Sequence, residues 1–462
     1  MSGLFGALGT STRGMNVNQY GLQTSGHNIA NTNTDGYSRQ RVNIQTERPY
    51  YIAGVGSIGM GAKSGGVDRI VDSFIRGQTR TAYSKYTFYE QKADILGQVE
   101  GFFNEPSKNG ILNQLSVMHD SWSKVASNPE LPTAKTSVIE NTNTFTDMLH
   151  QMSTQLKQLG NEVNDNLEKK VFDFNEKIKQ LQTLNGQIFA IASDGETPND
   201  LLDTRDGILK ELSGLVDIST EFDSYGRVAS LKMGGEDGFV VLSQNKRTEV
   251  KMDTLTLERK GNTGEVVISE GVMGGQLASK EEIDASLNEL NQFAEEVAVK
   301  INDVYSQAKP TDKFPFFELG TEDFAATITV SKDLREHPEN LVTGYEKIED
   351  GETQKPAPGD GTLAQAVSDV FNQKNGDTGT FADHYNSIVT KNGISKQQAD
   401  NTANAQLTLL NQLEYKDQSV SGVNINEEVS DVIRFSQAFQ ANAKVIQTIS
   451  EMLDTLINRT GV

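Results

Sequence analysis

The chain has 462 residues, which at roughly 150 residues per domain predicts two to four domains with a substantial core. Lys and Arg number 42 against 63 Asp and Glu, giving a formal net charge of -21, and this disfavours binding to nucleic acids or anionic membranes through phosphate neutralisation. The chain contains no Cys, which excludes disulfide frameworks, thiolate zinc sites, iron-sulfur clusters and cysteine nucleophiles.

Hydropathy gives no sign of a membrane segment. The longest apolar runs, such as residues 188–192 and 239–242, fall far short of the roughly 18 residues that a membrane-spanning helix needs. The first eight residues show neither a basic segment nor the apolar stretch of a secretory signal peptide. We therefore expect no membrane insertion and no signal-peptide cleavage.

The negative charge is concentrated in the middle of the chain. Residues 190–384 contain 38 acidic and 18 basic side chains, whereas the two flanks together contain 25 acidic and 24 basic ones. Near-neutral ends can pack against each other or against other copies, while an acidic centre faces water and repels its neighbours. An ordinary solvated surface domain would fit the same count.

Heptad spacing at both ends of the chain predicts two amphipathic helices, over about residues 4–30 and from residue 425 onward. The expected self-assembly seam consists of Leu8, Met15, Leu22 and Ile29 in the first helix and Ile425, Val432, Phe439, Ile446 and Leu453 in the last. Asn424, with Glu427 three residues later, resembles a capping box at the start of the last helix. Each helix has one apolar edge and gains little stability alone, so both should be marginal until packed.

Further helices are predicted in the interior. Apolar residues step by three and four over residues 145–163, 167–181 and 283–304, and a helical pattern resumes near Leu363. We interpret these segments as long antiparallel rod helices. By contrast, residues 217–275 combine short alternating runs with glycine-rich turns, which is typical of a small antiparallel β domain.

The predicted fold class is multidomain α+β, with long α-helical coiled-coil or rod domains built from both termini and an inserted small antiparallel β domain. The expected terminal coiled-coil assembly domain comprises 1–45 with 425–462. The expected helical rod domain comprises 46–216 with 276–308 and 361–424. A β-rich, acidic, outward-facing domain is expected over 217–275, with 309–360 left open as an addition.

Three motifs imitate catalytic or ligand sites without their context. Residues 54–59, Gly-Val-Gly-Ser-Ile-Gly, match a dinucleotide fingerprint, but more glycines follow where a helix should open, which favours a glycine-rich hairpin or loop. Residues 31–36 imitate a calcium loop, yet the twelfth position is Val42 instead of Glu. The five histidines are scattered and form no HExxH. We therefore predict no catalytic residues, no metal, no cofactor and no enzyme activity.

Two terminal segments carry a recognisable signature. Residues 21–40, Gly-Leu-Gln-Thr-Ser-Gly-His-Asn-Ile-Ala-Asn-Thr-Asn-Thr-Asp-Gly-Tyr-Ser-Arg-Gln, resemble the N-terminal signature of bacterial flagellar axial proteins. Residues 421–428, 435–448 and 454–458 resemble the C-terminal signature of the same group. Physically, Asn31 suits a left-handed cap, Asp35 and Gly36 suit a tight turn, and the Tyr37 ring can pack back on the helix end.

Rod, hook and junction proteins share these ends, so the interior has to distinguish them. Residues 197–206, Thr-Pro-Asn-Asp-Leu-Leu-Asp-Thr-Arg-Asp, are similar to the internal motif of the hook-associated protein 1 (FlgK) family, although many members begin the motif with Ser. The signature residues are Asn28, Asn31, Gly36, Tyr37, Asn199, Asp200, Asp203, Arg205 and Asp206.

The resemblance implies a structural subunit of the bacterial flagellum at the hook–filament junction, which adapts hook to filament by helical self-assembly. It also implies an extracellular location, reached through the flagellar type III export apparatus. The implied partners are the hook protein, the second junction protein (hook-associated protein 3), further copies in a helical ring, and the cytoplasmic export chaperone FlgN. A flagellar hook or rod subunit is the alternative, since it would account for both ends.

Overall fold

The computed structural model describes the chain except for residues 1, 53, 55, 104, 106, 245, 253–254, 257–265, 309–313, 350–351, 355, 375 and 460–462. Contacts divide the chain into two units. Unit 1 comprises residues 1–86, 171–271 and 405–462, and unit 2 comprises residues 87–170 and 272–404.

Long helices and short strands make up both units, which confirms the predicted α+β class. The helices are α1 (Ser2–Ala30), α2 (Ser73–Phe103), α3 (Ile111–Ser127), α4 (Pro132–Ala192), α5 (Asn199–Leu215), α6 (Gly271–Tyr305), α7 (Phe324–Thr327), α8 (Lys332–Glu336), α9 (Thr362–Val370), α10 (Phe381–Ser421) and α11 (Ile425–Asp454). The strands are β1 (Gln40–Thr46), β2 (Tyr50–Ile52), β3 (Gly56–Ile58), β4 (Ala62–Arg69), β5 (Ile218–Phe222), β6 (Val228–Met233), β7 (Phe239–Ser243), β8 (Lys246–Arg247), β9 (Leu255–Thr256), β10 (Val266–Val267), β11 (Phe317–Glu318), β12 (Thr329–Val330), β13 (Lys347–Glu349) and β14 (Glu352–Gln354). The domain boundaries drawn from the sequence stay a prediction.

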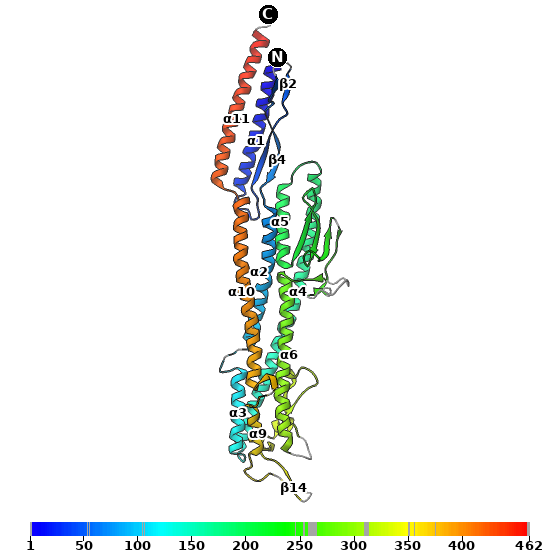
Figure 1. Cartoon of the computed structure of the whole chain (residues 1–462), viewed down its shortest axis with the longest axis vertical. Coiled ribbons are helices and arrows are strands. Elements are labelled where there is room, and N and C mark those ends of the chain that lie inside the picture. Colours follow the sequence, from blue (N-terminus) through cyan, green and yellow to red (C-terminus); the bar gives the residue numbers. More distant parts are fainter. Residues whose placement is uncertain are drawn as a thin grey trace. The chain divides into compact units, whose positions relative to one another are not determined.

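In unit 1 the first and last helices lie side by side, as Figure 1 shows for α1 and α11. The chain leaves α1 through a turn and enters β1, which pairs antiparallel with β4, and both strands contact α1. Between them β2 pairs antiparallel with β3, so residues 56–58 of the glycine-rich segment lie in a paired strand, in agreement with the hairpin that the sequence favours, while residue 55 lies outside the described residues.

The second sheet of unit 1 has four antiparallel strands in the order β5-β6-β7-β8. It is tied to the last turns of α4 by Asn185, whose Nδ2 donates to the Val228 carbonyl at 3.0 Å and whose Oδ1 accepts from the Val228 N–H at 3.0 Å. Leu231 and Leu242 are fully buried. The next pair, β9 and β10, is parallel, which differs from the antiparallel pairing expected over residues 217–275.

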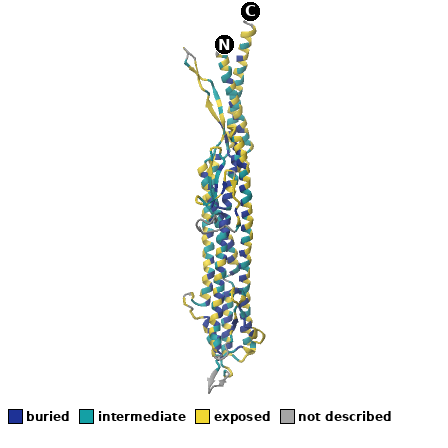
Figure 2. Ribbon diagram, turned by 90° about the vertical axis from the view of Figure 1, so that its right-hand side faces the viewer, coloured by how far each residue is buried: buried dark blue, intermediate teal, exposed yellow. Residues whose placement is uncertain are grey.

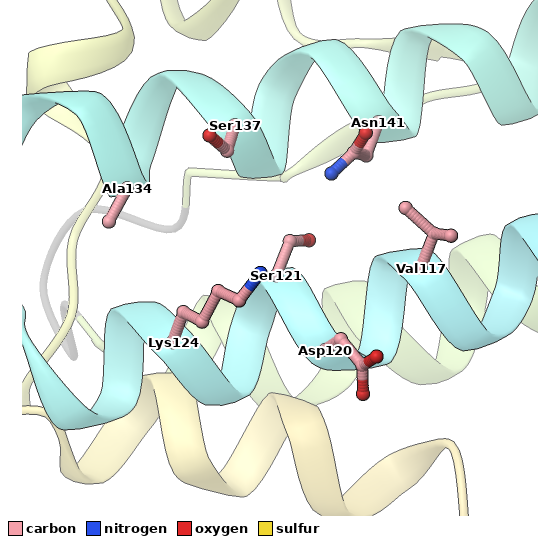
Figure 3. Close-up of a pocket in the computed structure, with 7 residues that line it drawn as sticks. All are labelled: Val117, Asp120, Ser121, Lys124, Ala134, Ser137 and Asn141. Carbon is pink, nitrogen blue, oxygen red and sulfur yellow. The ribbon is translucent and has the colours of Figure 1, made fainter.

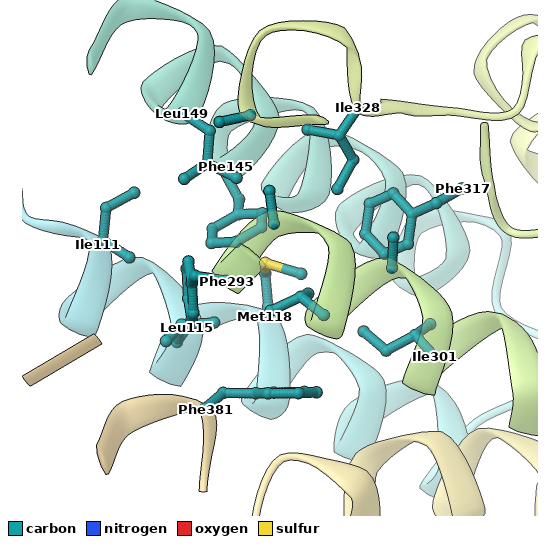
Figure 4. Packing of buried hydrophobic residues seen from close by; sticks show 14 of the residues in the cluster. Ile111, Leu115, Met118, Phe145, Leu149, Phe293, Ile301, Phe317, Ile328 and Phe381 are labelled. Carbon is teal, nitrogen blue, oxygen red and sulfur yellow. The ribbon is translucent and has the colours of Figure 1, made fainter. Parts of the chain in front are cut away.

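Unit 2 has an aromatic and aliphatic core. Phe145 of α4 and Phe293 of α6 are fully buried, with ring centroids 6.3 Å apart in an edge arrangement (Figure 4). Met118 and Trp122 of α3 are buried in the same cluster, and Trp122 packs on Phe316. The apolar rows predicted at 145–163 and 167–181 lie on one continuous helix of 61 residues, α4, whose residues from 171 onward belong to unit 1.

Candidate functional site

The turn after α1 is organised by the buried amide of Asn28. Its Nδ2 donates to the Gln40 carbonyl at 2.9 Å, while its Oδ1 accepts from the Gln40 N–H at 2.9 Å and from the Tyr37 hydroxyl at 2.8 Å. Gly36 has a φ of 74°, a left-handed conformation that suits glycine. The left-handed cap predicted at Asn31 is wrong, because Asn31 does not have a positive φ and its N–H donates to the His27 carbonyl, as in a continuing helix. The Asn28 amide therefore closes the loop that ends at Gln40.

The internal signature on α5 meets this turn. Asp203 accepts from Ser38 twice, from the N–H at 2.9 Å and from Oγ at 2.5 Å. Asp200 Oδ1 accepts from Gln40 Nε2 at 2.7 Å, and Asn199 Nδ2 donates to the Val67 carbonyl of β4 at 2.7 Å. The two signatures, more than 150 residues apart in sequence, thus form one site.

Three arginines surround the α5 carboxylates. Arg69 Nη1, at the end of β4, lies 2.8 Å from Asp203 Oδ1 and 2.8 Å from Asp206 Oδ2. Arg76 Nη1, in the first turns of α2, lies 2.6 Å from Asp206 Oδ2. Arg205 Nε donates to Asp206 Oδ1 at 2.9 Å, and its Nη1 donates to the Gly226 carbonyl. We call Ser38, Arg69, Arg76, Asp203, Arg205 and Asp206 the polar cluster.

Burial and ion pairing oppose each other within the polar cluster. Burial alone would raise the pKa of Asp206, but Arg205, Arg69 and Arg76 outweigh it and hold that pKa below its ordinary value. Burial lowers the pKa of the Arg205 guanidinium, partly offset by Asp206. Next to the cluster, burial first and then the carboxylates of Asp200, Asp203 and Glu428 raise the pKa of Tyr37. At neutral pH, therefore, Asp206 is ionised and Tyr37 is protonated.

The start of α11 joins the same region through Arg39. Its N–H donates to the carbonyl of Ser421, the last residue of α10, at 2.8 Å. Its Nε lies 2.6 Å from Glu428 Oε1 and its Nη1 lies 2.9 Å from Glu427 Oε2. Asn424 caps α11 by accepting from the Asn426 N–H, as an N-cap residue does, but Glu427 binds Arg39 and does not complete the predicted capping box.

The predicted seam residues flank the closest contacts between α1 and α11. Leu8, Met15, Leu22 and Ile29 are half-buried, as are Val432, Phe439, Ile446 and Leu453, and Ile425 is 49% exposed. Most of both helices is exposed or intermediate (Figure 2). Part of the apolar surface of this row therefore remains exposed to solvent in a single chain.

The closest approaches between α1 and α11 involve residues outside the predicted seam. A Cβ on Gly21 would lie 2.7 Å from Phe435 ring atoms, and a Cβ on Gly14 would lie 2.8 Å from Asn442 Oδ1. The seven-residue spacing from Gly14 to Gly21 and from Phe435 to Asn442 was the available signal.

Clusters of metal-ligating side chains and surface hollows bear on catalysis and ligand binding. Among the described residues, no three His, Asp or Glu side chains gather as a metal site would require, and no helix there is long and apolar enough to span a membrane. A shallow hollow of about 220 Å³ lies between α3 and α4 in unit 2 (Figure 3). It is lined by Val117, Asp120, Ser121, Lys124, Ala134, Ser137 and Asn141. The Ser121 hydroxyl there donates to the Met118 carbonyl at 2.7 Å, so it is no activated nucleophile.

Comparison with known proteins finds flagellar proteins that match this chain, as the sequence motifs predicted. The model of the flagellar hook-associated protein FlgK helical domain matches residues 96–313, and that of the flagellar basal body rod FlgEFG protein C-terminal region matches residues 418–459. The chain is 26% identical to flagellar hook-associated protein 1 of Bacillus subtilis, with 100% of this chain and 99% of that protein covered. The chain is thus similar to FlgK proteins along nearly its full length.

A second relative and a solved structure are also similar to this chain. Flagellar hook-associated protein 1 of Escherichia coli is 24% identical, over 98% of this chain and 99% of its own length. The flagellar hook junction protein FlgK from Burkholderia pseudomallei has the same fold, with a TM-score of 0.62 and 15% identity over 74% of this chain and all of that chain. The similarity to flagellar hook-associated proteins supports a structural protein of the flagellum, an extracellular structure.

Proposed function

We propose that the chain is a subunit of the hook–filament junction, which adapts hook to filament by helical self-assembly through α1 and α11. The observation that supports this most strongly is the match to FlgK proteins along nearly the full length of both sequences. The half-buried apolar row along α1 and α11 supplies the surface that neighbouring copies would cover.

The proposed partners and export route rest on the resemblance to FlgK proteins. We propose that the subunit contacts the hook protein, the second junction protein (hook-associated protein 3) and further copies of itself in a helical ring. Before assembly, FlgN would hold the C-terminal region in the cytoplasm, and the flagellar type III apparatus would export the chain without signal-peptide cleavage. We assign no catalytic step to the protein.

The alternative, a hook or rod subunit, shares the C-terminal region. The match at residues 418–459 is to rod proteins, so it does not distinguish the two functions, whereas the match at residues 96–313 favours the junction. A strain that lacks the protein separates them. Filament monomers released from finished hooks would support the junction role, and absence of hooks would support the alternative.

The seam can be tested by complementing that strain. Phe439→Asp places a carboxylate in the half-buried row of α11 and should block filament growth, since an unpaired charge at an interface is costly. Gln440→Asp, at the adjacent exposed position, adds the same charge and should complement normally. Normal filaments on Phe439→Asp hooks would contradict assembly through this row.

A further inference from the structure

The short break between α10 and α11 is encoded locally. Gly422 donates its N–H to the Gln418 carbonyl at 2.9 Å, and a Cβ on Gly422 would lie 2.3 Å from that oxygen, so the position requires glycine. Asn424 then caps the next helix. These residues specify where one helix ends and the next begins. The direction of α11 still depends on the backbone torsions of three linking residues, and so on what holds the two helix ends.

Arg39 holds both ends. Its N–H binds the last residue of α10, Ser421, while its guanidinium binds two successive carboxylates in the first turn of α11, Glu427 and Glu428. The Glu428 side chain is only 2% exposed, so its charge is shielded from water and depends on this partner. The planar guanidinium offers donors in a fixed fork, which a lysine ammonium cannot reproduce.

Arg39 is itself fixed from both sides. Ser38 is bound through its N–H and its hydroxyl to Asp203, and the N–H of Gln40 is bound to Asn28. The Arg39 carbonyl accepts from the Ile70 N–H at 2.8 Å. The position of residue 39 is thus set by the docked turn and by α5, and α11 is bound to that position.

We infer that Arg39 is a positioning residue that fixes the direction of α11 relative to the end of α10. The last helix then takes this direction only when the turn at residues 28–40 is bound to α5. Correct presentation of the seam for assembly would then depend on the N-terminal segment, a consequence that rests on the proposed junction function. The positioning itself is a property of the single chain.

The absence of Cys makes this directly measurable, because two introduced cysteines are the only labelling sites. Asn411→Cys on α10 and Gln440→Cys on α11 occupy exposed positions on either side of the break. Spin labels on the purified full chain should give one narrow distance distribution by pulsed electron paramagnetic resonance. Arg39→Ala should broaden that distribution at least twofold, and Arg39→Lys should broaden it to an intermediate extent.

Two further variants separate positioning from general structure. Glu427→Gln, at the more exposed partner, should keep the narrow distribution, whereas Glu428→Ala should broaden it like Arg39→Ala. The double exchange Arg39→Glu with Glu428→Arg should give a narrower distance distribution than either single change. A general loss of structure would not be rescued by exchanging the two charges. If circular dichroism shows that Arg39→Ala loses helicity, the distance distributions of the double exchange and of Glu428→Ala test the positioning role instead.

A narrow, unshifted distribution in Arg39→Ala and Glu428→Ala would overturn the inference, as would a broad distribution in the chain with only the two labels. The distances are measured on purified protein. Normal filaments on the strain that lacks the protein would therefore count against the junction role without affecting this test. Conversely, unchanged distances would leave the junction role standing.

Discussion

The core of unit 2 and the terminal pair α1–α11 are both helical, but they bury different kinds of residue. In unit 2 the contacts between helices are made by large apolar side chains such as Phe145 and Phe293, with no exposure to solvent. Between α1 and α11 the closest approaches place Gly14 against Asn442 and Gly21 against Phe435. Unit 2 therefore completes its core within one chain, whereas the terminal pair keeps its larger apolar residues half-exposed.

The base of the terminal pair differs again, since it is held by charge. The polar cluster places Asp203 and Asp206 among three arginines, all largely shielded from solvent. Buried ion pairs add little net stability over an apolar core, yet removing one partner is costly. Such a cluster is suited to fixing one geometry of the turn, and it leaves the hydrophobic surface of the helices available for assembly.

The largest effect is expected in unit 2. Phe293→Ala should cost about 3–5 kcal/mol of unfolding free energy, because it leaves a cavity among fully buried side chains. Trp122, the single tryptophan, is buried in the same core, so its fluorescence during urea unfolding reports on unit 2. Val299→Ala, on the same helix but 40% exposed, is the matched control and should stay within about 0.5 kcal/mol. Equal costs would contradict a core specific to unit 2.

The next effect is at the polar cluster. Asp206→Asn should cost about 3 kcal/mol at pH 7, since it leaves arginines without their shared carboxylate. Amide hydrogen exchange across residues 28–40 and α5 should report the loss, while the Trp122 unfolding curve should not move. A shift of the tryptophan curve instead would mean that the cluster supports unit 2.

The same variant has a defined pH dependence. Because the folded pKa of Asp206 is held below its ordinary value, its stabilising contribution is full above that ordinary value, near 3.8, and is lost as pH falls through the lower folded value. The difference between Asp206→Asn and the unsubstituted chain should therefore shrink in strong acid. A gap that stays constant from pH 7 into strong acid would refute the ion-pair origin.

The sequence predicted the helices better than the contacts between them. Heptad spacing and Asn424 placed the terminal helices close to their observed bounds, because apolar periodicity is a local signal. The helix α2 was not singled out, since part of its buried side consists of Thr79, Ser84 and Thr87 instead of large apolar residues. Family resemblance selected the α5 signature, but its partners Arg69 and Arg76 lie more than 120 residues away, and such ion pairs leave no pattern in one sequence.

A smaller effect is expected between α1 and α11. Gly21→Ala would push a methyl group into the Phe435 ring and should destabilise the pair by about 1–3 kcal/mol. Gly26→Ala, on the same helix with open space around it, should instead stabilise α1 by about 0.5–1 kcal/mol. Hydrogen exchange of α11 amides distinguishes the two signs. If both substitutions protect α11, the close approach at Gly21 is wrong.

The smallest effect is expected for an exposed ion pair in unit 1. Lys210 Nζ of α5 lies 2.7 Å from Glu414 Oε1 of α10, with both side chains at least 40% exposed. Water and salt screen such a pair, so Lys210→Gln should change the unfolding free energy by less than about 0.5 kcal/mol, with hydrogen exchange in α5 as the measure. Asp206→Asn on the same helix removes one carboxylate but acts where water is largely excluded. A loss at Lys210 as large as the loss at Asp206 would mean that contacts along the whole length of α5, instead of the shielded cluster at its start, hold the turn in place.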